Sequence, residues 1–270
     1  MRSGRSFWAV VLIVLGFLFL AGNLGLLSTN IWRLFWPAFL ILMGLWFLVG
    51  SSSSGSTAGL KMEEGFVELG DAQSASITVK HGAGRLALSG SADPDKLVSG
   101  SFANGLDARV KESGGRLQVL LQPQSKAFPD VFFPGSWVSG KGLAWDFSLS
   151  KEIPLDLVFE IGAVDAHLDL TELKVKDLVV KTGASSTKLK LPAAAGSTYF
   201  KVEAGAASMD INVPDGVAAR IEAEAGLASV KVDENRFPKG NGYYQSPNYE
   251  SAENKVDIRI ETGVASIEIR

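Results

Sequence analysis

The sequence predicts an all-β soluble domain, a β-solenoid or β-roll with rungs of about 21 residues, preceded by a two-helix transmembrane hairpin. Three observations predict this organisation: two long apolar runs in the first 50 residues, an uncharged serine- and glycine-rich segment behind them, and a glycine-centred motif that recurs along the second half of the chain. A two-sheet β-sandwich is the alternative fold.

Two apolar runs predict the hairpin over residues 1–50. Residues 7–27 carry no charge, and at about 1.5 Å per residue a helix of this length spans roughly 30 Å, the thickness of the hydrocarbon core of a bilayer. Residues 34–50 form a second, shorter apolar run. Tryptophans near the run ends suit the headgroup region. A cleaved signal peptide is the alternative for the first run, but the second run favours an inserted hairpin.

The few charges near the runs predict the side of the membrane. Two spans place both flanking regions on one side, and Arg2 and Arg5 outweigh the single Arg33 between the runs, so the large domain is expected in the cytoplasm of a bacterial cell. A re-entrant second run would instead place it outside. Residues 51–60 read as a flexible linker, and residues 61–270 as the β domain, with insertions at about 123–144 and 238–254.

The repeat is centred on glycines at intervals of 21, 22, 21 and 37 residues, with a weaker copy near residue 82. Around each glycine apolar and polar residues alternate with the period of a β-strand. A unit with two such strands cannot bury its apolar face alone, but stacked units share one core. The glycine suits a bend between two sheets, where no large side chain fits. The repeat glycines are Gly82, Gly162, Gly183, Gly205, Gly226 and Gly263.

The polar columns and the final strand suggest how the rungs meet. In the column five residues after each glycine, Lys188, Asp210, Lys231 and Glu268 alternate in sign, as neighbouring cross-strand pairs should. Because the chain stops directly after the last strand, that strand is expected to leave an uncapped edge. Such an edge could pair with a second copy or with a partner strand.

Composition excludes several classes of function. The chain has no cysteine and two histidines, so it can hold no disulfide or thiolate zinc site and offers little for a histidine-based metal centre or triad. Its formal charge is −3, and no concentrated basic surface for nucleic acid is apparent. We therefore expect no cofactor and no nucleic-acid partner.

Two groups of polar residues are candidates for a metal site or a catalytic site. Asp165, His167 and Asp169 alternate along one strand and could hold a metal, but a solvated strand face is the preferred interpretation. Glu203 and Glu224 are expected as neighbours in one polar column, yet without a cleft they read as surface charge rather than as a glycosidase pair. The prediction is that the protein is not an enzyme.

Aromatic residues in the two insertions are the candidate contact surface. The first insertion region could stack on a sugar, touch the membrane or cover the side of the stack, and covering the stack is favoured. The second could form a contact loop or pack against the stack. The residues proposed for contact are Phe132, Phe133, Trp137, Tyr243, Tyr244 and Tyr249, and Phe128 and Trp145 belong to the same aromatic group.

The residues also resemble known families. The segments LIVLGFLFLAGNLGLL and WRLFWPAFLILMGLWFLVG resemble the LiaI/LiaF-like transmembrane region, and WDFSLSKEIPLDLVFEIGAVDAHLDLTELKVKDLVVKTGAS is similar to the toast-rack domain and to related domains named for adhesins and for the response to cell-wall-active antibiotics. The resemblance implies a bacterial membrane protein with a solenoid-like domain and supplies no catalytic residues. LiaF-like members are associated with holding an envelope-stress two-component system in check.

Together these inferences predict a membrane-anchored, non-enzymatic scaffold that modulates cell-envelope stress signalling by contact with the bilayer and with another membrane protein such as a sensor kinase. The alternative is a surface-exposed, adhesin-like module that binds cell wall or neighbouring cells.

Overall fold

A computed structural model describes residues 62–124, 143–225, 228–240 and 242–270, all within the unit Ala58–Arg270. The predicted spans, most of the first insertion and the repeat glycine Gly226 lie outside these residues, as do Phe128, Phe132, Phe133 and Trp137. Within the described residues, none of the elements is a helix long and apolar enough to cross a membrane.

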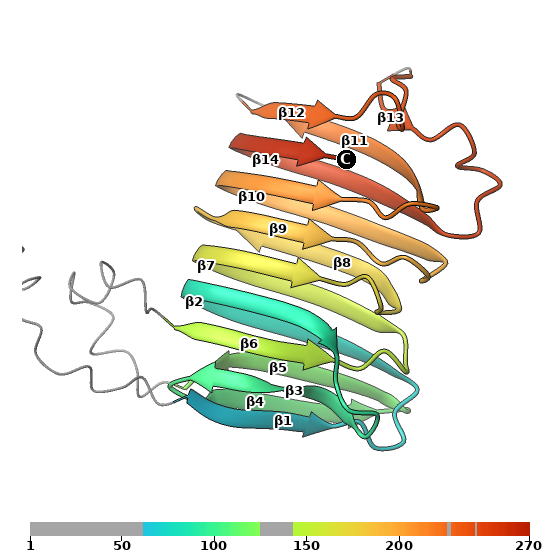
Figure 1. The fold of residues 1–270 in the computed structure, drawn as a ribbon. Helices are drawn as coiled ribbons and strands as arrows, with labels where there is room; N and C mark the ends of the chain where they lie inside the picture. Colours follow the sequence, from blue (N-terminus) through green and yellow to red (C-terminus); the bar gives the residue numbers. More distant parts are fainter. Residues whose placement is uncertain (1–61, 125–142, 226–227, 241) are drawn as a thin grey trace, which may run out of the picture. The chain divides into compact units, whose positions relative to one another are not determined.

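Every regular element of the described part is a strand, which confirms the all-β prediction for this domain (Figure 1). The strands are β1 (Met62–Glu68), β2 (Ser74–Ser91), β3 (Lys96–Ala103), β4 (Leu106–Ser113), β5 (Arg116–Pro123), β6 (Ala144–Leu149), β7 (Leu155–Asp169), β8 (Val175–Thr182), β9 (Ser186–Lys190), β10 (Ser197–Asn212), β11 (Ala218–Ala225), β12 (Ser229–Val232), β13 (Tyr244–Gln245) and β14 (Lys255–Ile269).

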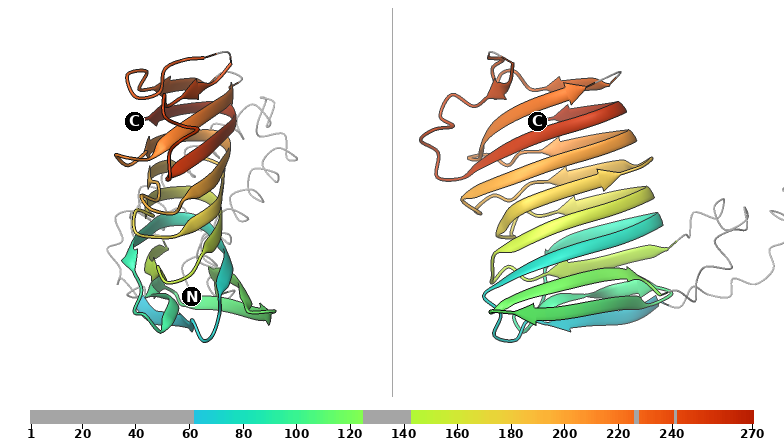
Figure 2. Two further views of the ribbon diagram at one scale, coloured as in Figure 1. Left: turned by 90° about the vertical axis from the view of Figure 1, so that its right-hand side faces the viewer. Right: turned by 180° about the vertical axis from the view of Figure 1, so that it is seen from behind.

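The repeats stack as parallel rungs with two faces. The long strands β2, β7, β10 and β14 each contain a repeat glycine and bend there, so their halves lie on opposite faces of the stack (Figure 2). Two further rungs are split at the bend: β8 and β9 make one, and β11 and β12 make the other. Equivalent positions pair in parallel, as Leu168 with Leu189 and Leu189 with Ile211. This register is the one that the two-residue period and the repeat interval predict.

The order of the final rungs differs from the expected one. β14 lies between β10 on one side and β11 with β12 on the other, so the C-terminal strand is an inner rung and the prediction that it forms an uncapped edge is wrong. Ile269 pairs with Ile211 and with Val232, and thus separates two residues expected as neighbours.

Side-chain bulk explains this order. β14 buries four isoleucines that face the interior, Ile258, Ile260, Ile267 and Ile269. The last rung, formed by β11 and β12, offers mostly alanine and valine in the same columns. An inner rung is covered from both sides and an end rung from one, so the arrangement that buries more apolar area places the isoleucines inside.

The polar columns change with the rung order. Asp210 lies beside Glu268 and not beside Lys231, so the predicted alternation of charge is wrong at this step. Arg270 donates a hydrogen bond to Asp210 at 2.6 Å, and its positive charge offsets the negative charges of Asp210 and Glu268. Likewise Glu261, and not Glu224, is the neighbour of Glu203.

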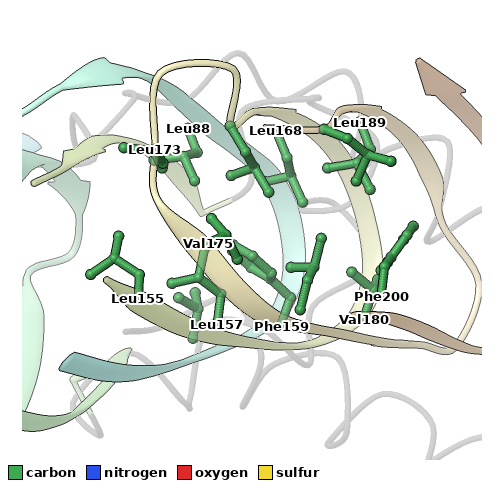
Figure 3. Packing of buried hydrophobic residues seen from close by; sticks show 14 of the residues in the cluster. Leu88, Leu155, Leu157, Phe159, Leu168, Leu173, Val175, Val180, Leu189 and Phe200 are labelled. Carbon is green, nitrogen blue, oxygen red and sulfur yellow. The ribbon is translucent and has the colours of Figure 1, made fainter. Parts of the chain in front are cut away.

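The core runs along the stack between its two faces. Leu88, Leu168 and Leu189 line one face and Leu157, Phe159 and Val180 line the other (Figure 3), all nearly inaccessible to solvent. Each rung therefore serves as the floor for the next, with strands about 4.8 Å apart. Burial of each large apolar side chain contributes about 1.5–3 kcal/mol.

The bend brings backbone atoms of successive rungs close together. A Cβ atom added at Gly162 would lie 2.2 Å from the carbonyl oxygen of Gly82, and one at Gly205 would lie 3.1 Å from the carbonyl oxygen of Gly183. The corresponding distance at Gly263 is 3.6 Å, an ordinary contact. A side chain at the bend is thus excluded at Gly162 and tolerated at Gly263.

Candidate interaction surface

The two ends of the stack are the places where its backbone pairing and its core stop, so they are the first candidates for a contact site. At the N-terminal end the pairing turns antiparallel: β6 pairs with β3, β3 with β1, and β5 with β4. Among the described strands of this end, β2, β5 and β6 join the parallel stack.

Aromatic side chains fill the N-terminal end. Phe102, Trp145 and Phe147 are almost fully buried, and the rings of Phe102 and Trp145 meet edge to face at 5.1 Å. His81 packs on the other side of the indole at 4.9 Å. Trp145 is 0% exposed, so it belongs to the core and neither stacks on a sugar nor touches the membrane.

His81 is held at this end by one backbone contact. Its Nε2 lies 2.9 Å from the carbonyl oxygen of Leu143. Burial lowers the pKa of His81 to about 4, and the contact with Leu143 opposes this shift only in part. The imidazole is therefore neutral at physiological pH and acts as a packing residue.

Among the described residues, those that cover the C-terminal end lie over its half away from the bend. Residues 233–240 and 242–254 form this cover, which we call the cap. Within it Phe237 is buried, β13 pairs with Arg220 and Ile221 of β11, and Ser246 bonds to the backbone of Ala219.

The tyrosines of the second insertion pack on the stack. Tyr249 is 5% exposed and donates a hydrogen bond to Asp257 at 2.7 Å. Burial, with a smaller contribution from that hydrogen bond, raises the pKa of Tyr249 above its usual range. Arg220 lies over the rings of Tyr249 and Tyr243, at 4.4 and 5.6 Å. Tyr243 and Tyr244 are half-buried, so the tyrosines of this insertion pack against the stack more than they project into solvent.

The other half of the C-terminal end, beside the bend, is open. Ala223 is exposed and Val230 and Val232 are half-buried, whereas Ile260, Ile267 and Ile269 in the same columns of β14 are buried. Within the described residues β12 pairs with β14 alone, and β13 reaches no further along β11 than Ile221. We call Ala223 together with β12 the open edge.

The backbone of the open edge points outward at alternate residues. The N–H of Asp233 bonds to the carbonyl of Ile269 at 3.0 Å, so the odd-numbered residues of β12 face β14. The N–H and C=O groups of Val230 and Val232 therefore point away from the stack. These outward groups, next to partly exposed apolar side chains, are what an added strand would bind.

The residues proposed for chemistry are engaged in surface pairs. His167 and Asp165 are 3.8 Å apart and exposed, while Asp169 accepts hydrogen bonds from Thr171 and Lys190. Within the described ranges no three His, Cys, Asp or Glu side chains are grouped as a metal ion would require.

Glu203 belongs to a ladder of ion pairs on the outer face. It lies 3.4 Å from Lys181 and 3.0 Å from Lys201, and Lys201 also reaches Glu261 at 3.1 Å. A hydrogen bond from Lys201 lowers the pKa of Glu203 and keeps it ionised, unlike a general acid. Glu203 and Glu224 are separated by Glu261, so the expected acid pair is not adjacent.

Parallel rungs that stack around one shared core define the class of this fold, an all-β repeat domain. The chain belongs to the family described as the N-terminal domain of toast_rack, whose model matches residues 55–212. Residues 6–48 match the LiaI-LiaF-like transmembrane region, which implies a membrane location. Both matches agree with the resemblance noted from the residues.

A solved structure supports the fold. The chain is similar to one described as a "putative cell adhesion protein" from Clostridium sporogenes, with 22% identity and a TM-score of 0.66, over 77% of this chain and 98% of that one. No curated protein matches the chain. The toast-rack match ends at residue 212, so β11 to β14 and the cap lie beyond it.

Proposed function

We propose that this protein is a membrane-anchored, non-enzymatic scaffold that modulates cell-envelope stress signalling through contact with another membrane protein such as a sensor kinase. The observation that carries the proposal is the pairing of a LiaI-LiaF-like transmembrane region with a toast-rack domain in one chain. The described surface supports it, because Glu203 and Glu261 are engaged in ion pairs with lysines and the apolar columns of the inner rungs form the core.

A topology measurement tests this proposal. The chain has no cysteine, and Ser208 is exposed on β10, so a Ser208→Cys variant carries a single reactive thiol. A cytoplasmic domain predicts no labelling by an impermeant maleimide in intact cells and full labelling after the cells are permeabilised. Labelling of intact cells would contradict the cytoplasmic modulator.

A signalling readout tests the regulatory part. Deletion of the chain should raise the basal output of an envelope-stress reporter, and expression of the full chain should restore it. The reporter should also ignore Glu203→Gln and Glu224→Gln, because these acids serve as surface charge. An unchanged reporter after deletion would contradict the modulator role whichever side the domain occupies.

Surface adhesion is the second candidate. It is favoured by the structural similarity to the protein described as a putative cell adhesion protein. This function requires labelling of Ser208→Cys in intact cells, and it predicts that the deleted strain loses binding to cell wall or to neighbouring cells.

A further inference from the structure

The C-terminal end of the stack has a stepped shape. On the side away from the bend, the cap lies over β11, and its residues Phe237 and Tyr249 are buried. On the bend side, Ala223 and Val230 stay partly accessible and the outward backbone groups of β12 have no partner strand in the described part of the chain. One half is raised and closed, and the other is low and open.

We propose that the open edge binds the open edge of a second copy of this chain, with the two β12 strands antiparallel about a two-fold axis. This arrangement turns the second copy so that its cap lies over the open half of the first, and the reverse. A step-shaped end is complementary to itself under such a rotation, as an isologous interface requires. The proposal goes beyond the proposed function and does not depend on it.

Backbone direction and charge select one register. The outward-facing residues of β12 must oppose outward-facing residues of the second copy, so even-numbered positions pair with even-numbered ones. The register that pairs Val230 with Val230 sets Ser229 opposite Lys231 of the other copy. The neighbouring register pairs Val230 of one copy with Val232 of the other. It places Lys231 of one copy opposite Lys231 of the other, where like charges repel.

The interior columns also match in this register. Val230 of the two copies meets at the axis, and Val232 lies opposite Ala228, so small apolar side chains continue the core from one stack into the other. Both chains carry the LiaI-LiaF-like region, and attachment to one membrane raises the effective concentration of this short contact.

Disulfide trapping between two differently tagged full-length chains tests the register. One chain carries Ser229→Cys and the other Lys231→Cys, and the mixture is oxidised in the membranes of cells that express both. The expected result is a strong dimer that contains both tags, with at most a trace when either variant is present alone.

The matched control uses the same residue types in an inner rung. Ser186 and Lys188 of β9 are exposed and occupy the same columns as Ser229 and Lys231, but β9 is paired on both sides. The mixture of Ser186→Cys and Lys188→Cys should give no more than a trace of dimer. Equal trapping in both mixtures would overturn the proposal.

A second variant separates loss of contact from loss of fold. Val230→Pro removes an outward N–H and leaves the hydrogen bonds of β12 to β14 in place. It should abolish the two-tag dimer when combined with the cysteine pair, while the thermal midpoint of the domain stays within a few degrees. Trapping that survives Val230→Pro would overturn the proposal, as would trapping of Ser229→Cys to a different protein instead of the second copy.

Discussion

The two ends of the stack differ in how their core is covered, and the difference separates a well-buried end from a partly exposed one. At the N-terminal end, antiparallel strands close both faces over Phe102, Trp145 and Phe147. At the C-terminal end, the cap closes only the half away from the bend and leaves β12 with pairing on one side. Repeat stacks need an end that stops further stacking. In the described residues, the core is closed by the aromatic cluster at the N-terminal end, where β1 and β4 are the edge strands, and it is covered in part at the C-terminal end.

Removal of an aromatic side chain from the closed end should have the largest effect on stability. Phe102 is fully buried against Trp145 and Phe147, so Phe102→Ala should lower the free energy of unfolding by about 3–5 kcal/mol. Val230→Ala at the half-exposed open edge should cost about 1 kcal/mol or less. Urea unfolding followed by circular dichroism measures both, and equal losses would contradict the contrast between the ends.

Acid should weaken the closed end through His81. Burial lowers its pKa in the folded state to about 4, against an ordinary value of 6.5, so the unfolded chain binds the proton first as the pH falls. Stability from this residue is complete above pH 6.5 and declines as the pH drops towards 4, by roughly 3 kcal/mol in total.

The measurement is the free energy of unfolding across this pH range for the wild type and for His81→Phe. The difference between the two profiles isolates His81, because both proteins carry the same carboxylates. Parallel profiles would show that the imidazole is not neutral and buried in the folded domain.

Substitution of the bend glycines by alanine should change stability by different amounts in different rungs. At Gly162 a methyl group would collide with the carbonyl of Gly82, so Gly162→Ala should cost about 1–3 kcal/mol. Gly263→Ala, where the nearest atom is 3.6 Å away, should be neutral or slightly stabilising. Thermal melts of both variants test this, and equal shifts would mean that the bend is not set by backbone contact.

The smallest effect is expected in the cap. Tyr249→Phe removes the hydrogen bond to Asp257 but keeps the buried ring, and Asp257 can still reach water. The loss should be about 1 kcal/mol. Tyr249→Ala should cost more, because it also empties the space beneath the cap. If the two variants unfold alike in urea, the ring does not hold the cap down.

The sequence predicted much of this fold because the two-residue period is a direct consequence of strand geometry. Leu168, Leu189 and Ile211 could be placed in register from the repeat alone. Placing β14 could not follow from spacing, since the last two rungs carry the same pattern and either order satisfies it. The feature that distinguishes the two rungs is side-chain size. β14 carries isoleucines where the neighbouring rung carries smaller residues such as Ala219, Ala223 and Val230.

The candidate site was predicted less well, for a related reason. The open edge is a property of which rung comes last, so the error in rung order moved it from β14 to β12. The tyrosines of the second insertion were identified as notable, but whether Tyr249 packs or projects depends on Asp257 and Arg220, which are distant from any motif.

The position of β14 has a consequence for biosynthesis. β11 and β12 leave the ribosome before the strand that must lie between them and β10. Until residues 255–269 are available, the nascent domain has either a gap or a provisional pairing of β10 with β11, which must open to admit the later strand. Completion of this domain is thus an insertion and not a simple addition of rungs.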